Sequence, residues 1–196
     1  MVNKRISSIA FKCRGIFWGV FAAGVLVFPD DFNMMRFIGG LFILICGQVL
    51  RFWAAGYIPK YRTETIGAPV LVTWGPYRWI RNPLYAGNFI MGVGWAIMVG
   101  WKWVIVFAVA FFLLYCLIVI PAEEEFLLSK FGNTYKEYKS NVPALLPLRL
   151  GNHISGLRQK RHAFNAKVAW SQEIYSIRVN VAVTLLIAAR LYFNFK

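Results

Sequence analysis

The chain has 196 residues, of which 59% are hydrophobic and only 15% are charged. A soluble domain carries about 25% charged residues, so this composition excludes an ordinary water-soluble protein and indicates an integral membrane protein. The 22 Lys and Arg residues outnumber the 8 Asp and Glu residues, which gives a net charge of +14. Because nucleic-acid binders are rarely this apolar, we expect no nucleic-acid partner and assign the excess cations to loops on the cytoplasmic side of a bilayer.

Two apolar runs come first. Residues 15–28 are too few for the roughly 20 that cross a bilayer, so this helix is expected to borrow length from residues 6–14. It lacks a small-residue cleavage site, so we expect no cleaved signal peptide. The second run covers residues 37–50 and resumes after Arg51. At that depth Arg51 either faces the protein interior or extends toward the near surface, and both alternatives remain open.

The next two runs, residues 82–101 and 103–122, contain no charged residue. Lys102 separates them and is flanked by two tryptophans, which favour the headgroup level of a membrane. These runs are therefore expected to form a helical hairpin. A last span is expected within residues 178–196, after a basic segment at residues 149–177, which we interpret as a cytoplasmic loop near anionic headgroups.

The loop charges test this count. With a cytoplasmic N-terminus, seventeen Lys and Arg residues lie inside and three lie outside, a clear positive-inside bias. We therefore predict an all-α integral membrane protein, a single membrane domain over residues 1–196, with about five transmembrane helices. The C-terminus is then outside. The expected membrane is the cell inner membrane, or the endoplasmic reticulum in a eukaryote.

One conspicuous cytoplasmic block, residues 71–87, leads into the third span. Pro83 suits the first turn of a helix, where its missing N–H costs nothing. The N-terminus of that helix offers backbone N–H groups to a carboxylate, and the Gly75-Pro76 turn directs Tyr77 back toward it. The alternative is that Arg78 and Arg81 are ordinary positive-inside anchors.

A second block covers residues 121–138, where the fourth span is expected to continue into water as a helix. Three of the eight acids, Glu123, Glu124 and Glu125, gather there and suggest a cationic partner, either Arg78 and Arg81 or a cationic ligand. The hairpin places both blocks at the same membrane face. We therefore expect a cytoplasmic-face cofactor pocket with aromatic walls, a carboxylate wall and a helix N-terminus, a set that matches S-adenosylmethionine.

The two blocks also carry a resemblance. The run Leu-Val-x-x-Gly-Pro-Tyr-Arg-x-x-Arg-Asn-Pro-Leu-Tyr, residues 71–85, resembles a signature of the isoprenylcysteine carboxyl methyltransferases and the related phospholipid methyltransferases. Glu-Glu-Glu-x-Leu-Leu-x-x-Phe-Gly-x-x-Tyr-x-Glu-Tyr, residues 123–138, resembles their second signature. The resemblance covers residues 40–148, which it implies are the methyltransferase core. It implies an S-adenosylmethionine-dependent enzyme acting on a lipophilic acceptor: an isoprenylcysteine-like carboxylate, an aminophospholipid, or a small thiol or amine.

Carried over by motif, the resemblance implies a set of cofactor contacts: Val70, Leu71, Val72, Tyr77, Asn82, Pro83, Leu84, Tyr85 and Glu124. Two further residues are candidates for chemistry. We expect Arg81 to orient the carboxylate of the cofactor or the substrate, and Glu125 to accept a proton from an amine acceptor.

Two positions depart from the family pattern. The Arg-His-Pro of the family reads Arg81-Asn82-Pro83 here, and an asparagine cannot titrate. The arginine that grips the substrate carboxylate in prenylcysteine enzymes is replaced by apolar residues around Val119. This substitution disfavours a prenylcysteine carboxylate as the acceptor.

Two other functions remain open. A sterol-reductase-like membrane enzyme would bind NADPH and should offer a basic pocket for the 2′-phosphate, which the acidic residues 123–125 oppose. A non-enzymatic membrane scaffold would bind no cofactor. Cys and His residues show no ligand spacing, so we predict no metal site.

Overall fold

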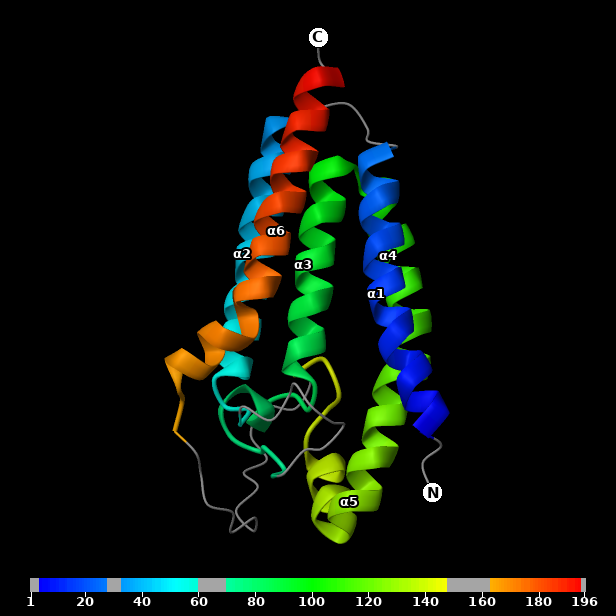
Figure 1. The fold of residues 1–196 in the computed structure, drawn as a ribbon, viewed down its shortest axis with the longest axis vertical. Helices are drawn as coiled ribbons and strands as arrows, with labels where there is room; N and C mark the ends of the chain where they lie inside the picture. The colour runs from blue at the N-terminus through cyan, green and yellow to red at the C-terminus, as the bar shows by residue number, and fades with distance from the viewer. Residues whose placement is uncertain (1–3, 28–32, 60–69, 148–162, 195–196) are drawn as a thin grey trace.

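A computed structural model describes residues 4–27, 33–59, 70–147 and 163–194. Within these residues every regular element is helical. Helices α1 (Lys4–Val27), α2 (Met34–Ala55), α3 (Pro83–Val99) and α6 (Ala166–Asn194) run side by side (Figure 1). Helix α4 (Trp101–Phe111) continues through the π-helical segment η3 (Phe112–Val119) into α5 (Ile120–Asn141), which is broken at Gly132. The predicted all-α membrane fold is confirmed.

In the part of the chain that the structure describes, three helical stretches are long and apolar enough to cross a membrane: Met34–Ala55, Trp101–Asn141 and Ala166–Phe193. The apolar part of α1, Gly15–Val27, and helix α3 are shorter, although both lie alongside the long helices (Figure 1). The protein is therefore an integral membrane protein, and the count of five spans stays a prediction.

Helices α2 and α3 pack closely because glycines face each other across their contact. A methyl group on Gly40 would lie 2.5 Å from the carbonyl oxygen of Gly94, and one on Gly47 would lie 2.8 Å from that of Gly87. Small residues at such positions let membrane helices approach to backbone contact. Helix α3 is thereby fixed against α2.

An aromatic core joins α1 to the hairpin. Phe21 and Phe107 have ring centroids 4.7 Å apart, and Phe111 stacks on Tyr115 at 4.3 Å. The indole of Trp18 donates to the Tyr115 hydroxyl at 3.0 Å. Aromatic pairs at these separations add to the burial that holds a helix bundle together.

The hairpin is present where the sequence predicts it. The turn between α3 and α4 lies at Gly100, and Trp101 and Lys102 are exposed beside it. One boundary differs: α6 begins at Ala166 instead of at about residue 178, so its first turns lie in the segment interpreted as a basic loop.

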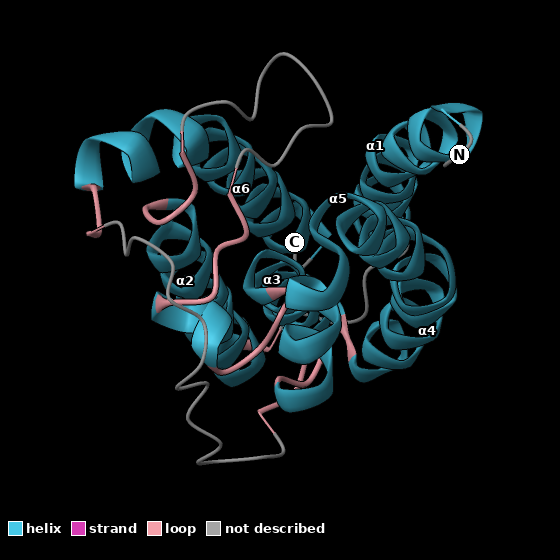
Figure 2. Ribbon diagram, turned by 90° about the horizontal axis from the view of Figure 1, so that it is seen from below, coloured by secondary structure: helices cyan, strands magenta, loops and turns pink. Residues whose placement is uncertain are grey.

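Figure 1 shows how the ends of the bundle differ. The N-terminus, α5 and residues 70–82, which lead into α3, lie at one end, and the C-terminus lies at the other. Seen from below in Figure 2, α5 and the described loop residues that lead into α3 lie at this end of the bundle. The two blocks that the sequence marks are therefore at the same end of the molecule.

Candidate functional site

The first block forms a tight turn. Gly75 has φ 61°, a value that favours glycine, and starts the short 3₁₀ helix η2 (Gly75–Arg78). The amides of Trp79 and Ile80 both donate to the carbonyl of Pro76, at 3.0 and 3.2 Å. Within this turn Tyr77 is buried.

The block continues into α3. Pro83 occupies the first helical turn and Asn82 is the N-cap residue, but its side chain makes no capping bond. Instead its amide Nδ2 donates to the carbonyl of Ala144 at 3.2 Å. The backbone amides of Arg81 and Asn82 donate to the carbonyls of Pro143 and Ala144 at 2.8 and 3.0 Å. These bonds join the first block to the chain that comes after the second.

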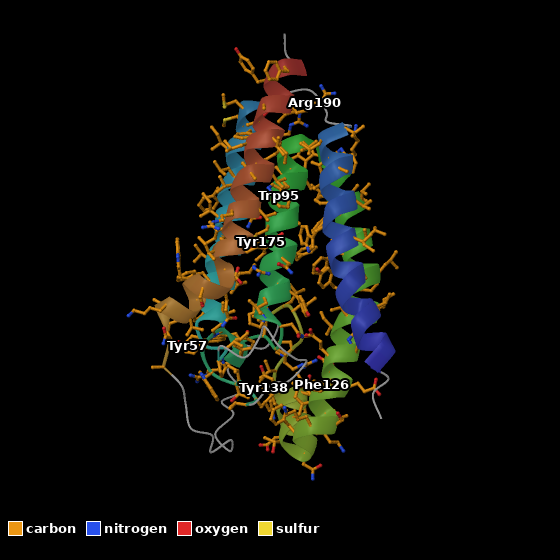
Figure 3. The ribbon with its side chains drawn as sticks, viewed as in Figure 1. Tyr57, Trp95, Phe126, Tyr138, Tyr175 and Arg190 are labelled. Carbon is orange, nitrogen blue, oxygen red and sulfur yellow. The ribbon has the colours of Figure 1, made fainter. Side chains whose placement is uncertain are left out.

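Within α5 the chain reverses direction at Gly132, whose φ of 54° and ψ of −128° are not helical. The reversal brings the residues after it back to the first block. The Tyr138 hydroxyl donates to the carbonyl of Tyr77 at 2.6 Å, and Figure 3 shows Tyr138 at the lower end of the bundle. Burial, followed by the charge of Glu124, raises the pKa of Tyr135, and burial also raises the pKa of Tyr138.

An ion cluster lies at the centre of this arrangement. Arg81 donates through Nε and Nη2 to Oε1 of Glu124, at 3.0 and 2.6 Å. Lys139 reaches Oε2 of the same carboxylate at 2.8 Å. Glu124 is only 8% exposed, so its charge is balanced by two cations. Of the cationic partners that the sequence leaves open, Arg81 pairs with Glu124, joined by Lys139.

Arg81 also holds the backbone together. Its Nη1 donates to the carbonyl of Lys139 at 2.9 Å and to that of Val142. Since Nε, Nη1 and Nη2 all donate to the protein, Arg81 bridges the two blocks. This arrangement favours a positioning role over direct contact with a ligand.

A second carboxylate lies close by. The Tyr85 hydroxyl donates to Oε1 of Glu123, and the Tyr85 ring is 5.1 Å from that of Tyr115. Glu125 is exposed on the same helix. Glu123 and Glu124 therefore face the bundle and the first block, whereas Glu125 lies outside this cluster.

The remaining predicted contacts surround the same place. Leu71 is buried in a small apolar cluster below the bundle with Tyr135, Tyr138 and Val142. The neighbours Val70 and Val72 and the helix residue Leu84 are half-buried, and Pro83 is buried. The predicted cofactor residues are thus brought together, with Arg81 and Glu124 at the centre and Glu125 apart.

A separate polar cluster was not predicted. Arg51 forms an ion pair with Glu173 of α6, its Nη2 lying 2.8 Å from Oε1, and it also donates to Asn88 of α3. Of the two alternatives for Arg51, the interior position is the one adopted. The signal for Glu173 was its place as a lone acid in a basic segment. Among the described residues, no group of three or more His, Cys, Asp or Glu side chains could hold a metal ion.

Comparison of the sequence with known proteins gives one family and several relatives. The phospholipid methyltransferase family model matches residues 35–134, from α2 into α5. The chain is 30% identical to steroid 5-alpha-reductase DET2 of Solanum lycopersicum, over 60% of this chain and 44% of that protein. It is 31% identical to the cobalt-zinc-cadmium resistance protein CzcN of Cupriavidus metallidurans, over 73% and 58%. It is 30% identical to protein-S-isoprenylcysteine O-methyltransferase of Xenopus laevis, over 68% and 49%.

The chain spans about half the length of these curated relatives. No solved structure matches it.

Proposed function

The chain belongs to the phospholipid methyltransferase family, and from this membership we propose that it transfers a methyl group from S-adenosylmethionine to a lipophilic acceptor in the membrane. One observation carries the proposal: the Arg81–Glu124 ion pair draws both sequence blocks into one cluster at the start of α3. The domain boundaries follow the same reasoning, with residues 40–148 as the methyltransferase core.

The chemistry of the cluster fits this cofactor. Glu123 and Glu124 supply carboxylates for the ammonium group. The start of α3, which the Asn82 side chain does not cap, offers its positive end to the cofactor carboxylate. Tyr77 and Tyr85 are buried aromatic residues that suit the flat adenine. Each charged or planar part of the cofactor thus has a partner of matching chemistry.

The main role of the cluster residues is to bind and align the methyl donor and the acceptor, not to react with them. When bound, S-adenosylmethionine supplies a methyl group on a cationic sulfur. Methyl transfer is fast when donor and acceptor are held in line in a site without water. Arg81 fixes the two blocks relative to each other, and the aromatic residues around Tyr85 and Tyr115 exclude water. An amine acceptor must lose a proton, for which Glu123 lies closer to the buried cluster than the exposed Glu125.

The pairing of the arginines near the site limits the charge that the acceptor can carry. Arg51 is paired with Glu173, and Arg81 is paired with Glu124. Val119, at the position of the family arginine, is buried in the apolar core. An unpaired carboxylate at that depth would cost several kcal/mol. We therefore propose an amine-bearing or neutral lipophile, such as an aminophospholipid headgroup or a small thiol, ahead of a prenylcysteine carboxylate.

A reductase is the second candidate because one relative is named a steroid 5-alpha-reductase. Such an enzyme would need cations for the 2′-phosphate of NADPH. Arg81 and Lys139 already pair with Glu124, and Glu123 adds a further negative charge nearby. This charge balance favours the methyl donor.

The test is a binding measurement on the purified chain in detergent. S-adenosylhomocysteine and NADPH are titrated in parallel by calorimetry, and binding of the first alone is expected. Binding of NADPH alone would support the reductase, and binding of neither would support a scaffold.

An assay with labelled methyl donor then compares a farnesylcysteine analogue with a panel of lipophilic amines and thiols. Methylation of an amine or thiol is expected. Efficient methylation of the farnesylcysteine carboxylate would contradict the acceptor class and leave the methyltransferase proposal standing.

A further inference from the structure

We propose that α6, which lies outside the matched residues 35–134, is a working part of the cofactor site, and that Glu173 is the positioning residue through which it acts. The inference rests on the proposed function. It extends the functional unit beyond residue 148, because α6 fixes both the start of α3 and the Gly75–Arg78 turn.

The first step is the polar contact that fixes α6 against α2. Glu173 is fully buried at 0% exposure. Its Oε1 accepts from Nη2 of Arg51 at 2.8 Å, and its Oε2 accepts from Nε of Arg51 at 2.8 Å and from Gln48 at 3.1 Å. A two-point arginine–carboxylate pair fixes orientation as well as distance. Charges inside a membrane protein are rare and usually functional.

The second step links this pair to α3. Nη1 of Arg51 donates to Oδ1 of Asn88, in the second turn of the helix that starts at Pro83. The stem of Arg51 lies against Gly87, where an added methyl group would be 2.5 Å from Cγ of Arg51. Movement of Glu173 would therefore move Arg51 against the first turns of α3, which carry the predicted cofactor residues.

A second route reaches the first block independently. The amide of Asn165, just before α6, donates to the carbonyl of Gly56 at 3.0 Å. The Phe164 ring packs on Tyr57 with centroids 5.7 Å apart. Tyr57 in turn covers Gly75, where an added methyl group would be 2.4 Å from its ring. Figure 3 shows Tyr57 at the same end of the bundle as Tyr138.

The rest of α6 supplies a control. Asn180 donates to Gln48 at 2.6 Å, and Thr184 accepts from the indole of Trp95 at 3.1 Å. Thr184 lies farther along α6 than Glu173, and its partner Trp95 lies well above Tyr57 and Tyr138 in Figure 3, away from the cofactor residues. Loss of its bond should loosen the bundle without reaching the site.

The experiment uses the full chain in detergent, with Glu173→Gln and the control Thr184→Val. Calorimetric titration gives the Kd for S-adenosylhomocysteine, and hydrogen exchange followed by mass spectrometry gives the protection of residues 71–88. Glu173→Gln is expected to raise the Kd about fivefold or more, the lower end of coupling between separate sites, and to lower protection across residues 71–88. Thr184→Val is expected to lower the thermal midpoint and leave the Kd and that protection unchanged.

An unchanged Kd in folded Glu173→Gln would overturn the inference, as would equal weakening by the two variants. If Glu173→Gln does not fold, Phe164→Ala tests the second route with the same two readouts, and unchanged values there would also overturn it. If the wild type binds no S-adenosylhomocysteine, the proposed function fails. The exchange of residues 71–88 in the variants then still decides whether α6 orders this segment.

Discussion

The Glu124 carboxylate connects the two sequence blocks through its ion pairs. Its two carboxylate oxygens accept from Arg81 and Lys139, and the first of these cations also holds the backbone of residues 139 and 142. Removing the buried partner of a buried carboxylate is strongly destabilising, and Arg81, unlike the half-exposed Lys139, is such a partner. In the proposed function, the ammonium of the cofactor approaches this same carboxylate.

Replacing Glu124 with glutamine should weaken cofactor binding. A hydrogen bond to a charged group contributes about 1.5–3 kcal/mol, so the Kd for S-adenosylhomocysteine should rise about tenfold or more in a calorimetric titration. Glu137→Gln is the control, because Glu137 is exposed on the same helix. An unchanged Kd in a folded Glu124→Gln protein would remove Glu124 from the site.

Lys139 should act as a competitor of the cofactor ammonium. Its side chain is 49% exposed and lies 2.8 Å from Oε2 of Glu124, the oxygen that Arg81 does not use. A half-exposed ion pair contributes about 0.2–1 kcal/mol, so Lys139→Met should tighten S-adenosylhomocysteine binding by up to about fivefold. Lys136→Met, at an exposed position nearby, should have no effect. Weaker binding by Lys139→Met would show that Lys139 helps to hold the ligand instead.

The sequence could predict part of this cluster. Three adjacent acids needed a cation, and Arg81 was a candidate because the hairpin brings both blocks to one face. The contribution of Lys139 and the Tyr138–Tyr77 bond could not be predicted, because both depend on the chain reversal at Gly132. A continuous helix after residue 132 would carry Tyr138 and Lys139 away from Glu124.

At the scale of helices, the contact between α2 and α3 depends on glycines on one face only. A methyl group on Gly40 would be 2.5 Å from a backbone oxygen and 2.7 Å from Met98, whereas one on the adjacent Gly39 would meet nothing within 4 Å. Two neighbouring glycines thus offer a matched pair for a test of the helix contact.

Gly40→Ala should destabilise the protein by about 1–3 kcal/mol, because an overpacked contact forces the backbone to shift. Gly39→Ala should leave stability unchanged or raise it slightly, since alanine is the better helix former. Thermal unfolding of both variants in the same detergent gives the comparison. Equal midpoints would mean that the two helices can separate at no cost.

Most helix positions could be predicted from apolar runs of sufficient length, and the start of α6 could not. Its first turns contain Lys167, Glu173 and Arg178, which are typical of a polar loop when each residue is taken alone. In the bundle Glu173 is paired with Arg51 and Gln48, so its polarity is satisfied inside the protein. Such pairing depends on residues more than a hundred positions away, which local composition does not reveal.

At the scale of the whole molecule, the two blocks and the N-terminus share one end of the bundle, and the C-terminus lies at the other (Figure 1). The positive-inside bias assigns the first end to the cytoplasm. This assignment remains a prediction, as does the number of spans.

Cysteine labelling in intact cells tests the orientation. In a variant with its native cysteines replaced, a cysteine at Lys136, which is exposed on α5, should resist a membrane-impermeant reagent. A cysteine at Lys102, exposed at the turn between α3 and α4, should react. The reverse pattern would place the proposed cofactor site on the outer face.

The π-helical segment Phe112–Val119 has a consequence for how the chain tolerates changes in length. Each hydrogen bond of a π turn spans one residue more than that of an α turn. The segment therefore already contains an extra residue, which it can lose without rotating α5. Deleting one residue inside it should let the segment relax to α geometry and leave Glu124 facing inward. The same deletion in Trp101–Phe111 would turn α5 by about 100°. A deletion within Phe112–Val119 should therefore preserve the direction in which Glu124 faces, whereas a deletion in Trp101–Phe111 should change it.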